Sequence, residues 1–187
     1  MLFTILYMLT ILLMEKKDKE IYKGLSDTDA LTGLFNRRAF QAAVDETLLK
    51  RIAGVFIFID VDNFKNYNDK YGHANGDLCL KHFAATMKKC FPKDSILGRY
   101  GGDEFVVYIK NAASDAAHRY MDEFQREISH LMMSGGEHVT LSASAGGVAF
   151  AGEGEDFVSL CRSADNMLYD VKRNGKGTFK MKGAKNM

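Results

Sequence analysis

Two acidic pairs, each beside an apolar run, are the residues of this sequence with the clearest chemical potential. Asp60 and Asp62 follow the stretch AGVFIFI, and Asp103 and Glu104 follow two glycines within LGRYGGDEFVVYI. A hairpin turn can use the glycines, but it does not need adjacent acids. A carboxylate at the end of a buried strand is costly unless positive charge compensates it. If the two strands are neighbours, Asp60 and Asp103 converge on one or two Mg²⁺ ions, which prefer hard oxygen ligands.

Residues between the acidic pairs carry groups that suit a nucleotide. Lys65 is near enough in sequence to the first pair to meet a phosphate, while Asn68 and Asp77 offer edges that discriminate a purine. An aspartate carboxylate accepts hydrogen bonds from the N1–H and 2-amino group of guanine. Magnesium bound by few carboxylates keeps positions open for phosphate oxygens, so the pattern favours phosphoryl or nucleotidyl transfer.

Each of these residues also has a purely structural explanation, in which it takes no part in catalysis or binding. Asp62 or Asn63 is a suitable cap for a helix that begins near Phe64, and an isolated Gly-Gly-Asp-Glu is compatible with a solvated turn. Basic residues near the end of the chain complement the dipole of a preceding helix; they are Lys172, Arg173 and Lys176. It is the combination of two acidic pairs at strand ends that favours a cation site.

Helical and strand patterns alternate from residue 26 onward and predict the elements that hold these side chains. Helical spacing of apolar residues covers residues 35–52, 76–91, 114–133 and 156–177. Strand patterns cover residues 53–60, 97–109 with the glycine turn inside, 138–150 and 178–182. Mixed helices and strands with a tight hairpin predict an α/β or α+β sheet covered by helices.

Composition limits the chain to one ordinary globular domain with a short extension. It has 187 residues, of which 47% are apolar and 26% are charged, enough apolar material for a sizeable core. The formal net charge of +1 gives no electrostatic case for a nucleic-acid partner. The cysteines are odd in number and lack CxxC spacing, which predicts buried reduced thiols at Cys79, Cys90 and Cys161.

The start of the chain has a different character. Residues 1–14 carry no charge, and as a helix they would reach roughly 21 Å, short of the roughly 30 Å of a bilayer core. Three interpretations stay open: the tail of a membrane helix, a short membrane anchor, or an apolar dimerising helix. Residues 15–25 are interpreted as a charged helical linker, whose lysines favour a cytoplasmic catalytic domain over residues 26–187, with a membrane tether through residues 1–14 as an open alternative.

Five separated motifs resemble, in order and spacing, the GGDEF domain of diguanylate cyclases. They are DALTGLFNRRAF, DVDNFKNYNDKYGHANGD, RYGGDEFVVY, SASAGGVA and RSADNMLYDVKRNGKG, and the resemblance covers about residues 26–180. It implies an α+β fold with a central, mostly antiparallel sheet flanked by helices, similar to the palm of nucleotide cyclases. It also implies a homodimer in which two domains, each holding one GTP, meet face to face and make cyclic di-GMP with release of two pyrophosphates.

The resemblance implies roles for the acidic and polar residues. By position, Asp60, the backbone carbonyl of Val61 and Asp103 correspond to ligands of Mg²⁺, with Mn²⁺ as the other ion considered. Asp103 or Glu104 would help to deprotonate the attacking 3′-hydroxyl. The residues that correspond to the guanine readers are Asn68 and Asp77.

The resemblance also implies phosphate contacts. Phe64 and Lys65 lie on the phosphate-facing loop, where Lys65 would assist catalysis, and Lys172 would contact the phosphates. Lys176 stands where the family usually has arginine. This difference keeps the charge but loses the bidentate geometry of a guanidinium.

One departure from the pattern of the family concerns product inhibition. Many relatives carry an RxxD product-binding inhibitory site where this chain has Pro92 and Ser95, so feedback inhibition through that site is expected to be missing or weak.

The alternatives to a cyclase are a catalytically silent GGDEF module that binds GTP or cyclic di-GMP, a relative that uses ATP, and a structural dimerisation domain. Asp77 disfavours ATP, because adenine has no proton on N1. A purely structural role leaves the acidic pairs unexplained.

Overall fold

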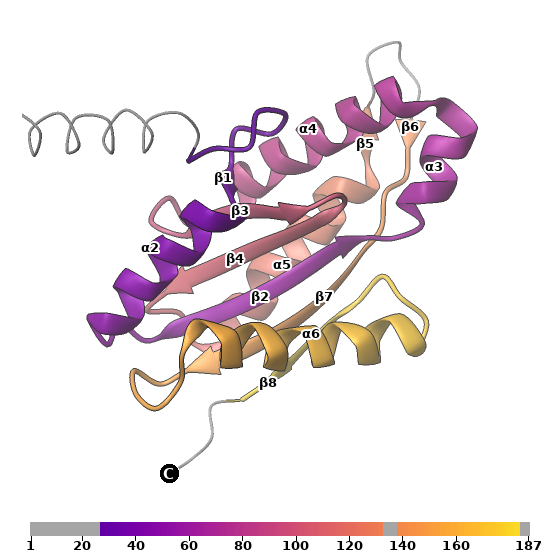
Figure 1. Ribbon diagram of the computed structural model, residues 1–187. Coiled ribbons are helices and arrows are strands. Elements are labelled where there is room, and N and C mark those ends of the chain that lie inside the picture. The colour runs from indigo at the N-terminus through magenta and orange to yellow at the C-terminus, as the bar shows by residue number, and fades with distance from the viewer. Residues whose placement is uncertain (1–26, 133–137, 184–187) are drawn as a thin grey trace, which may run out of the picture.

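The computed structural model, which describes residues 27–132 and 138–183, is built on a six-stranded sheet in the order β1-β3-β4-β2-β7-β8 (Figure 1). In that order, the strands are Phe35–Asn36, Ile96–Gly101, Glu104–Lys110, Gly54–Val61, Ala143–Phe150 and Phe179–Lys182. The three central pairings are antiparallel and the two edge pairings are parallel. The predicted mostly antiparallel sheet is confirmed.

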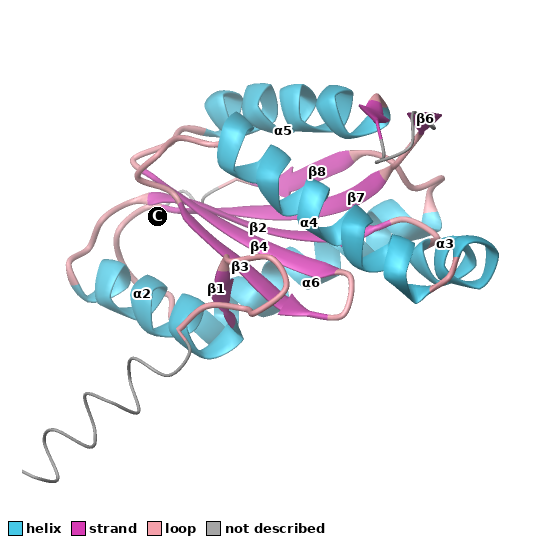
Figure 2. Cartoon of the chain, turned by 90° about the horizontal axis from the view of Figure 1, so that it is seen from above, coloured by secondary structure: helices cyan, strands magenta, loops and turns pink. Residues whose placement is uncertain are grey.

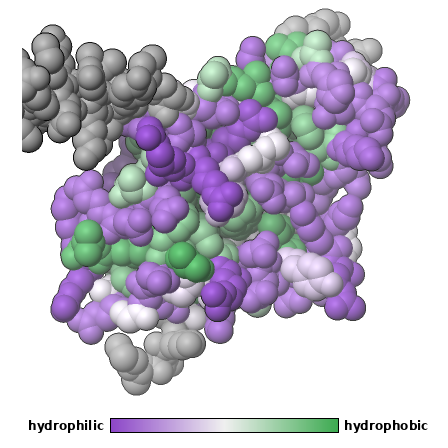
Figure 3. Space-filling view, viewed as in Figure 1, coloured by the Kyte–Doolittle hydropathy of each residue, from purple (hydrophilic) through white to green (hydrophobic). Residues whose placement is uncertain are grey.

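Helices cover both faces of this sheet (Figure 2). They are α2 (Arg37–Leu49), α3 (Phe64–Tyr71), α4 (His73–Cys90), α5 (Ser114–Ser129) and α6 (Phe157–Arg173). Alternate side chains of β2 divide between two cores: Val55 and Ile57 pack with α4 and α5, while Phe56 and Phe58 pack with α2 and α6. The strand is therefore buried on both faces, as its unbroken apolar run predicts. The face of the molecule seen in Figure 3 is mostly hydrophilic, with smaller hydrophobic patches.

Several element boundaries differ from the sequence-based expectations, and residues 35–36, expected at the start of a helix, form strand β1. Helix α5 ends at Ser129, whose hydroxyl donates to the Arg126 carbonyl, and the chain continues as the short strand β5 (Leu131–Met132) paired with β6 (His138–Val139). A side chain that bonds its own helix backbone competes with continued helix, so Leu131 lies in a strand. The strand expected over 138–150 is divided into β6 and β7. Helix α6 ends at Arg173 with Asn174 as its cap.

The cysteine and amino-terminal predictions have different outcomes. The three cysteines are free thiols, and Cys79 and Cys90 are buried as predicted, but Cys161 is only partly buried. The interpretations of residues 1–14 and 15–25 lie outside the described residues. Within the described part of the chain, none of the helices has the length and apolar character needed to cross a membrane.

Helix α6 lies directly on β7 at Gly146, and this contact gives a stability prediction. A Cβ at Gly146 would stand 2.2 Å from both the Ala164 carbonyl oxygen and the Leu168 nitrogen. Because helix backbone cannot yield locally, Gly146→Ala is expected to lower the free energy of unfolding by about 3 kcal/mol in urea denaturation. Gly183→Ala, where the new Cβ meets open space, is the control and should change stability by less than about 0.5 kcal/mol. Equal stability of the two variants would contradict the close approach.

Candidate active site

The two acidic pairs lie at adjacent strand ends. In the antiparallel register of β2 and β4, Asp60 is paired with Glu104. The Val61 N–H donates to the Asp103 carbonyl at 3.2 Å, so the backbones of the two motifs are hydrogen-bonded neighbours. The condition for a shared cation site, that the two acid-bearing strands are neighbours, is therefore met.

This acidic cluster is crowded with negative charge. The Asp60 side chain is 13% exposed, and burial raises the pKa of its carboxyl, while Lys172 Nζ, 2.7 Å from Oδ2, opposes that rise. Burial likewise raises the pKa of Glu104, and the neighbouring charges of Asp60 and Asp103 add to the effect. Lys172 therefore offsets only part of the repulsion within the cluster.

Lys172→Met is expected to destabilise the protein in a pH-dependent way. Because the folded pKa of Asp60 lies above its ordinary value of 3.8, ionising this carboxyl lowers stability as the pH rises through the folded pKa. Lys172 reduces that penalty, so its loss should cost about 1 kcal/mol at about pH 7, after allowance for the partial exposure of the ion pair, and less than half of that at about pH 4. The measurement is the free energy of unfolding in urea at both pH values.

Methionine keeps much of the apolar stem of lysine, so the comparison isolates the charge. Lys93→Met, at an exposed lysine in the turn before β3, is the control and should show no such pH dependence. A Lys172→Met penalty of the same size at both pH values would show that packing, rather than the ion pair, is lost.

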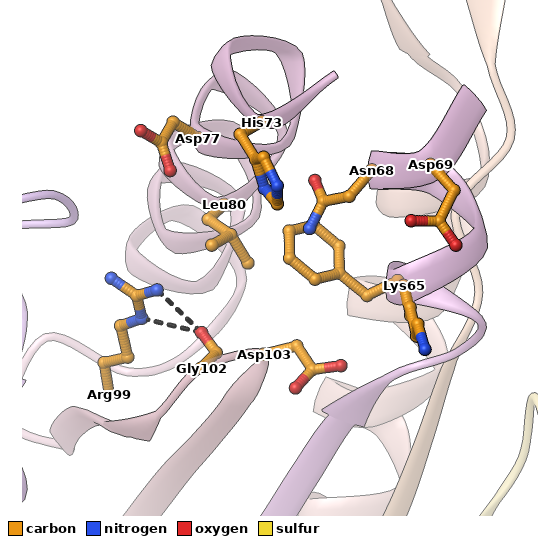
Figure 4. A pocket seen from close by; sticks show the side chains of 10 residues that line it. Lys65, Asn68, Asp69, His73, Asp77, Leu80, Arg99, Gly102 and Asp103 are labelled. Carbon is orange, nitrogen blue, oxygen red and sulfur yellow. Dashed lines mark hydrogen bonds between the residues drawn. The ribbon is translucent and has the colours of Figure 1, made fainter. Parts of the chain in front are cut away.

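A cavity of about 390 Å³ adjoins the acidic cluster, and α3, α4 and the β3–β4 turn line it (Figure 4). The lining residues are Phe64, Lys65, Asn68, Asp69, His73, Asp77, Leu80, Arg99, Gly102 and Asp103. The structure thus brings five of the sequence-predicted residues to one cavity: Phe64, Lys65, Asn68, Asp77 and Asp103. Apolar side chains beside charged ones make a cavity of the kind that binds a planar base with a polar edge.

The predicted residues outside the cavity lining gather at the end of β2. Lys172 is held by its ion pair with Asp60, and Lys176 Nζ donates to Asn63 Oδ1 at 2.9 Å. Asn63 is the N-cap residue of α3, but it has left-handed backbone angles and makes no side-chain capping hydrogen bond. The interpretation of Asp62 or Asn63 as a side-chain cap is therefore wrong.

Gly76 is a site residue that sequence reasoning did not single out. A Cβ at this position would lie 1.8 Å from Asn68 Oδ1, so glycine lets α4 approach the Asn68 amide of α3. The Asn68 oxygen is buried and has no hydrogen-bond partner among the described residues. Buried polar atoms are rarely left in this state, which marks this amide as a group placed for more than packing.

Arg99 is a second residue that sequence reasoning missed. Its Nε and Nη2 donate to the Gly102 carbonyl at 2.9 and 2.7 Å (Figure 4). Its Nη1 donates to Asp29 at 3.1 Å. Burial would raise the pKa of Asp29, but hydrogen bonds from Thr32 and Arg99 hold it below its ordinary value. Gly102 has a φ of 46°, which favours glycine, and Arg99 fixes this turn beside Asp103.

The donor set at the strand ends suits a divalent cation. Among residues 27–132 and 138–183, no group of three or more His, Cys, Asp or Glu side chains is arranged to hold a metal ion alone. The set available here is the two carboxylates of Asp60 and Asp103 with the backbone carbonyl of Val61. All three groups are hard oxygen donors, and the excess negative charge of the cluster favours a cation.

Comparison with known proteins identifies the family and agrees with the fold. The family described as "Diguanylate cyclase, GGDEF domain" matches residues 26–178. A diguanylate cyclase of Vibrio cholerae is 34% identical over 164 residues, which are 84% of this chain and 50% of that protein. The cyclic di-GMP phosphodiesterase PdeR of Escherichia coli is 33% identical over 168 residues, which are 88% of this chain and 25% of that protein.

A solved structure shares the architecture. The coiled coil and GGDEF domain of DgcB from Caulobacter crescentus, in complex with c-di-GMP, superposes with a TM-score of 0.80 at 24% identity, over 94% of this chain and 95% of that chain. At this identity the likeness shows the fold. The chain spans half or less of the length of the two curated relatives. With the family match over most of its length, the chain belongs to the GGDEF domain family of diguanylate cyclases.

Proposed function

We propose that this domain is a diguanylate cyclase that condenses two GTP molecules into cyclic di-GMP and releases two pyrophosphates. The observation that carries the proposal is the cross-strand pairing of Asp60 with Glu104 beside a cavity that Asn68 and Asp77 line. An acidic cluster next to a base-sized cavity suits a nucleotide whose triphosphate reaches the cluster. The similarity to the Vibrio cholerae cyclase supports the same reaction.

The cavity residues would hold the guanine base. Phe64 and Leu80 supply apolar contact, and the Asp77 carboxylate would accept hydrogen bonds from the N1–H and the 2-amino group. The Asn68 amide would meet the O6 or N3 side of the same base. Its position against Gly76 restricts the movement of this amide, which favours a single base orientation.

The acidic cluster would bind Mg²⁺ or Mn²⁺ through Asp60, Asp103 and the Val61 carbonyl. The bound ion would offset phosphate charge and lower the pKa of the attacking 3′-hydroxyl. Either Asp103 or Glu104 would accept the hydroxyl proton. The triphosphate would contact the three lysines Lys65, Lys172 and Lys176.

The reaction requires a second copy of the domain. A single bound GTP carries a 3′-hydroxyl and an α-phosphate that cannot reach each other in line. Two domains facing each other in a homodimer would bring each hydroxyl to the other nucleotide's phosphorus, a gain from positioning. Because GTP is a cytoplasmic nucleotide, the proposal also assigns the domain to the cytoplasm.

A second candidate function is a catalytically silent module that binds GTP or cyclic di-GMP and signals by contact. The similarity to PdeR, a protein named as a phosphodiesterase, favours this candidate. The retention of Asp60, Asp103 and Glu104 favours the cyclase. A silent module would bind guanine nucleotides and form no product, which separates the two candidates in one assay.

Incubation of the protein with GTP and Mg²⁺ is the test, with chromatographic detection of the product. We expect cyclic di-GMP and two equivalents of pyrophosphate, and no product when the metal is removed by a chelator. Binding of GTP without any product under these conditions would reject the cyclase in favour of the silent module.

Added cyclic di-GMP is expected to inhibit this reaction little through the segment that contains Pro92 and Ser95. Pro92 has no side-chain donor, and its backbone carbonyl already accepts from the Ser95 N–H at 3.0 Å. With added cyclic di-GMP, the initial rate of pyrophosphate release in Ser95→Ala should therefore lie within about twofold of the wild-type rate, because Ser95 contributes no phosphate-binding charge. Strong product inhibition that Ser95→Ala relieves would contradict this prediction.

A further inference from the structure

The carboxylate of Asp62, the residue after β2, accepts hydrogen bonds from three donors on other parts of the chain. Ser142 Oγ donates to Oδ2 at 2.5 Å, Ser144 Oγ donates to Oδ1 at 2.7 Å, and the Gly177 N–H donates to Oδ2 at 3.0 Å. The Gly177 N–H also reaches Ser144 Oγ at 3.2 Å. Asp62 therefore joins the end of β2 to the start of β7 and to the turn after α6.

The turn that Asp62 holds has an uncommon backbone conformation. Gly175, Lys176 and Gly177 have φ values of 117°, 61° and 64°. Lys176 is not a glycine, so its left-handed conformation is unfavourable by itself and persists only where surrounding contacts fix it. A Cβ at Gly177 would lie 2.9 Å from Ser142 Oγ, so the turn packs closely against the serines that also bind Asp62.

Fixing this turn determines where the Lys176 side chain lies. Its Nζ donates to Asn63 Oδ1, one residue after Asp62, and thus lies at the same end of β2 as the Lys172–Asp60 ion pair. The Lys176 N–H also donates to the Val171 carbonyl at 3.2 Å, which ties the turn to the end of α6. The hydrogen bond from Gly177 to Asp62 ties the same turn to the end of β2, and without it the two glycines of Asn-Gly-Lys-Gly leave the turn freer to move.

We infer that Asp62 is a positioning residue that holds the 175–177 turn so that Lys176 faces the triphosphate, and that it is not a ligand of the metal ion. This inference rests on the proposed function for the identity of the nucleotide. Both oxygens of Asp62 already accept hydrogen bonds from the protein, so this carboxylate does not need a cation to compensate its burial. Asp60 differs in this respect, because the partner of its carboxylate is the Lys172 ammonium group.

The first test is Asp62→Asn, which keeps the shape but replaces one acceptor oxygen by an NH₂ group. The amide hydrogen exchange of Gly177 is expected to accelerate by about tenfold or more, because its acceptor is weakened. Affinity for Mg²⁺–GTP, measured by calorimetry, should fall about tenfold, the scale of one charge-assisted phosphate contact, while affinity for guanosine stays within about twofold.

The second test is coupling to Lys176. If Asp62 acts through this lysine, the double variant Asp62→Asn/Lys176→Ala should bind Mg²⁺–GTP no more weakly than Lys176→Ala alone. Additive losses would overturn the inference. Ser142→Ala, which removes one exposed donor to the same carboxylate, provides a milder variant and should shift Gly177 exchange in the same direction.

The third measurement separates positioning from metal binding. Titration of Mn²⁺ without nucleotide, followed by electron paramagnetic resonance, should give affinities for Asp62→Asn and wild type that agree within about twofold, since a lost carboxylate ligand typically costs far more. Loss of Mn²⁺ binding with unchanged Gly177 protection would overturn the inference. None of these readouts needs product, so a wild type that makes no cyclic di-GMP would reject the proposed function and leave the positioning role testable.

Discussion

Asp103→Ala is expected to abolish cyclic di-GMP formation, with a fall in rate of about a thousandfold or more. The substitution removes one of the two carboxylates proposed to hold the metal ion and a candidate acceptor for the hydroxyl proton. The measurement is product formation from GTP and Mg²⁺, followed over a time long enough to detect a residual rate.

The fold should survive this substitution. The hydrogen bond between the Val61 N–H and Asp103 uses the backbone carbonyl of residue 103, which alanine retains. The Asp103 charge raises the pKa values of both Asp60 and Glu104, so its removal relieves repulsion in the cluster. We therefore expect a melting temperature equal to or above that of the wild type.

Asp94→Ala is the matched control for this experiment. Asp94 is exposed in the turn before β3 and lies away from the cavity lining, so its loss should leave the rate unchanged. Full activity of Asp103→Ala would refute the metal assignment. Loss of activity together with a lower melting temperature would show that this side chain supports the fold.

The parts of the site that sequence predicts are those whose chemistry is visible locally. The run AGVFIFID predicts a strand that is buried on both faces and ends in an acid. The Gly-Gly turn predicts a hairpin with acids beside it. Adjacent strands then bring Asp60 to Glu104. Hydrophobic periodicity and turn chemistry therefore predict an acidic pair at each strand end, while the adjacency of the two strands comes from the fold.

The supporting contacts are not predictable in this way, because their partners are distant in sequence. Arg99 meets Asp29 across 70 residues, and Asp62 meets Ser142 and Gly177 across 80 and 115 residues. In the sequence, Asp62 has the features of a helix cap, and only the packing of β7 and the final turn against β2 reveals its donors. The local sequence is compatible with more than one role for such a residue, and tertiary contacts determine which role it has.

The same limit applies to helix ends and to glycines. The apolar stripe of α5 continues to Leu131, but Ser129 bonds its own helix backbone and the chain enters β5. Gly76 has the appearance of a weak helix residue in sequence, while in the fold its missing side chain makes room for the Asn68 amide. Steric constraints of this kind have no local pattern.

Asp77→Asn is expected to reduce the preference for GTP over ATP by about a hundredfold, because sites built on hydrogen bonds to a substrate discriminate strongly against analogues that lack them. The Asp77 carboxylate has two acceptor oxygens for the N1–H and 2-amino group of guanine, and asparagine replaces one of them with a donor. Calorimetric affinities for GTP and ATP, each with Mg²⁺, give the ratio directly.

A charge effect of the cavity must be separated from recognition of the base edge, and Asp69 provides the means. Asp69 lines the same cavity from α3, so Asp69→Asn removes the same charge from a different side of the site (Figure 4). A general change in cavity charge would alter both variants alike and would act on both triphosphates, which carry equal charge, leaving the ratio of affinities unchanged. Direct recognition predicts that the ratio falls in Asp77→Asn alone. An unchanged ratio in Asp77→Asn would remove this residue from the base-reading role.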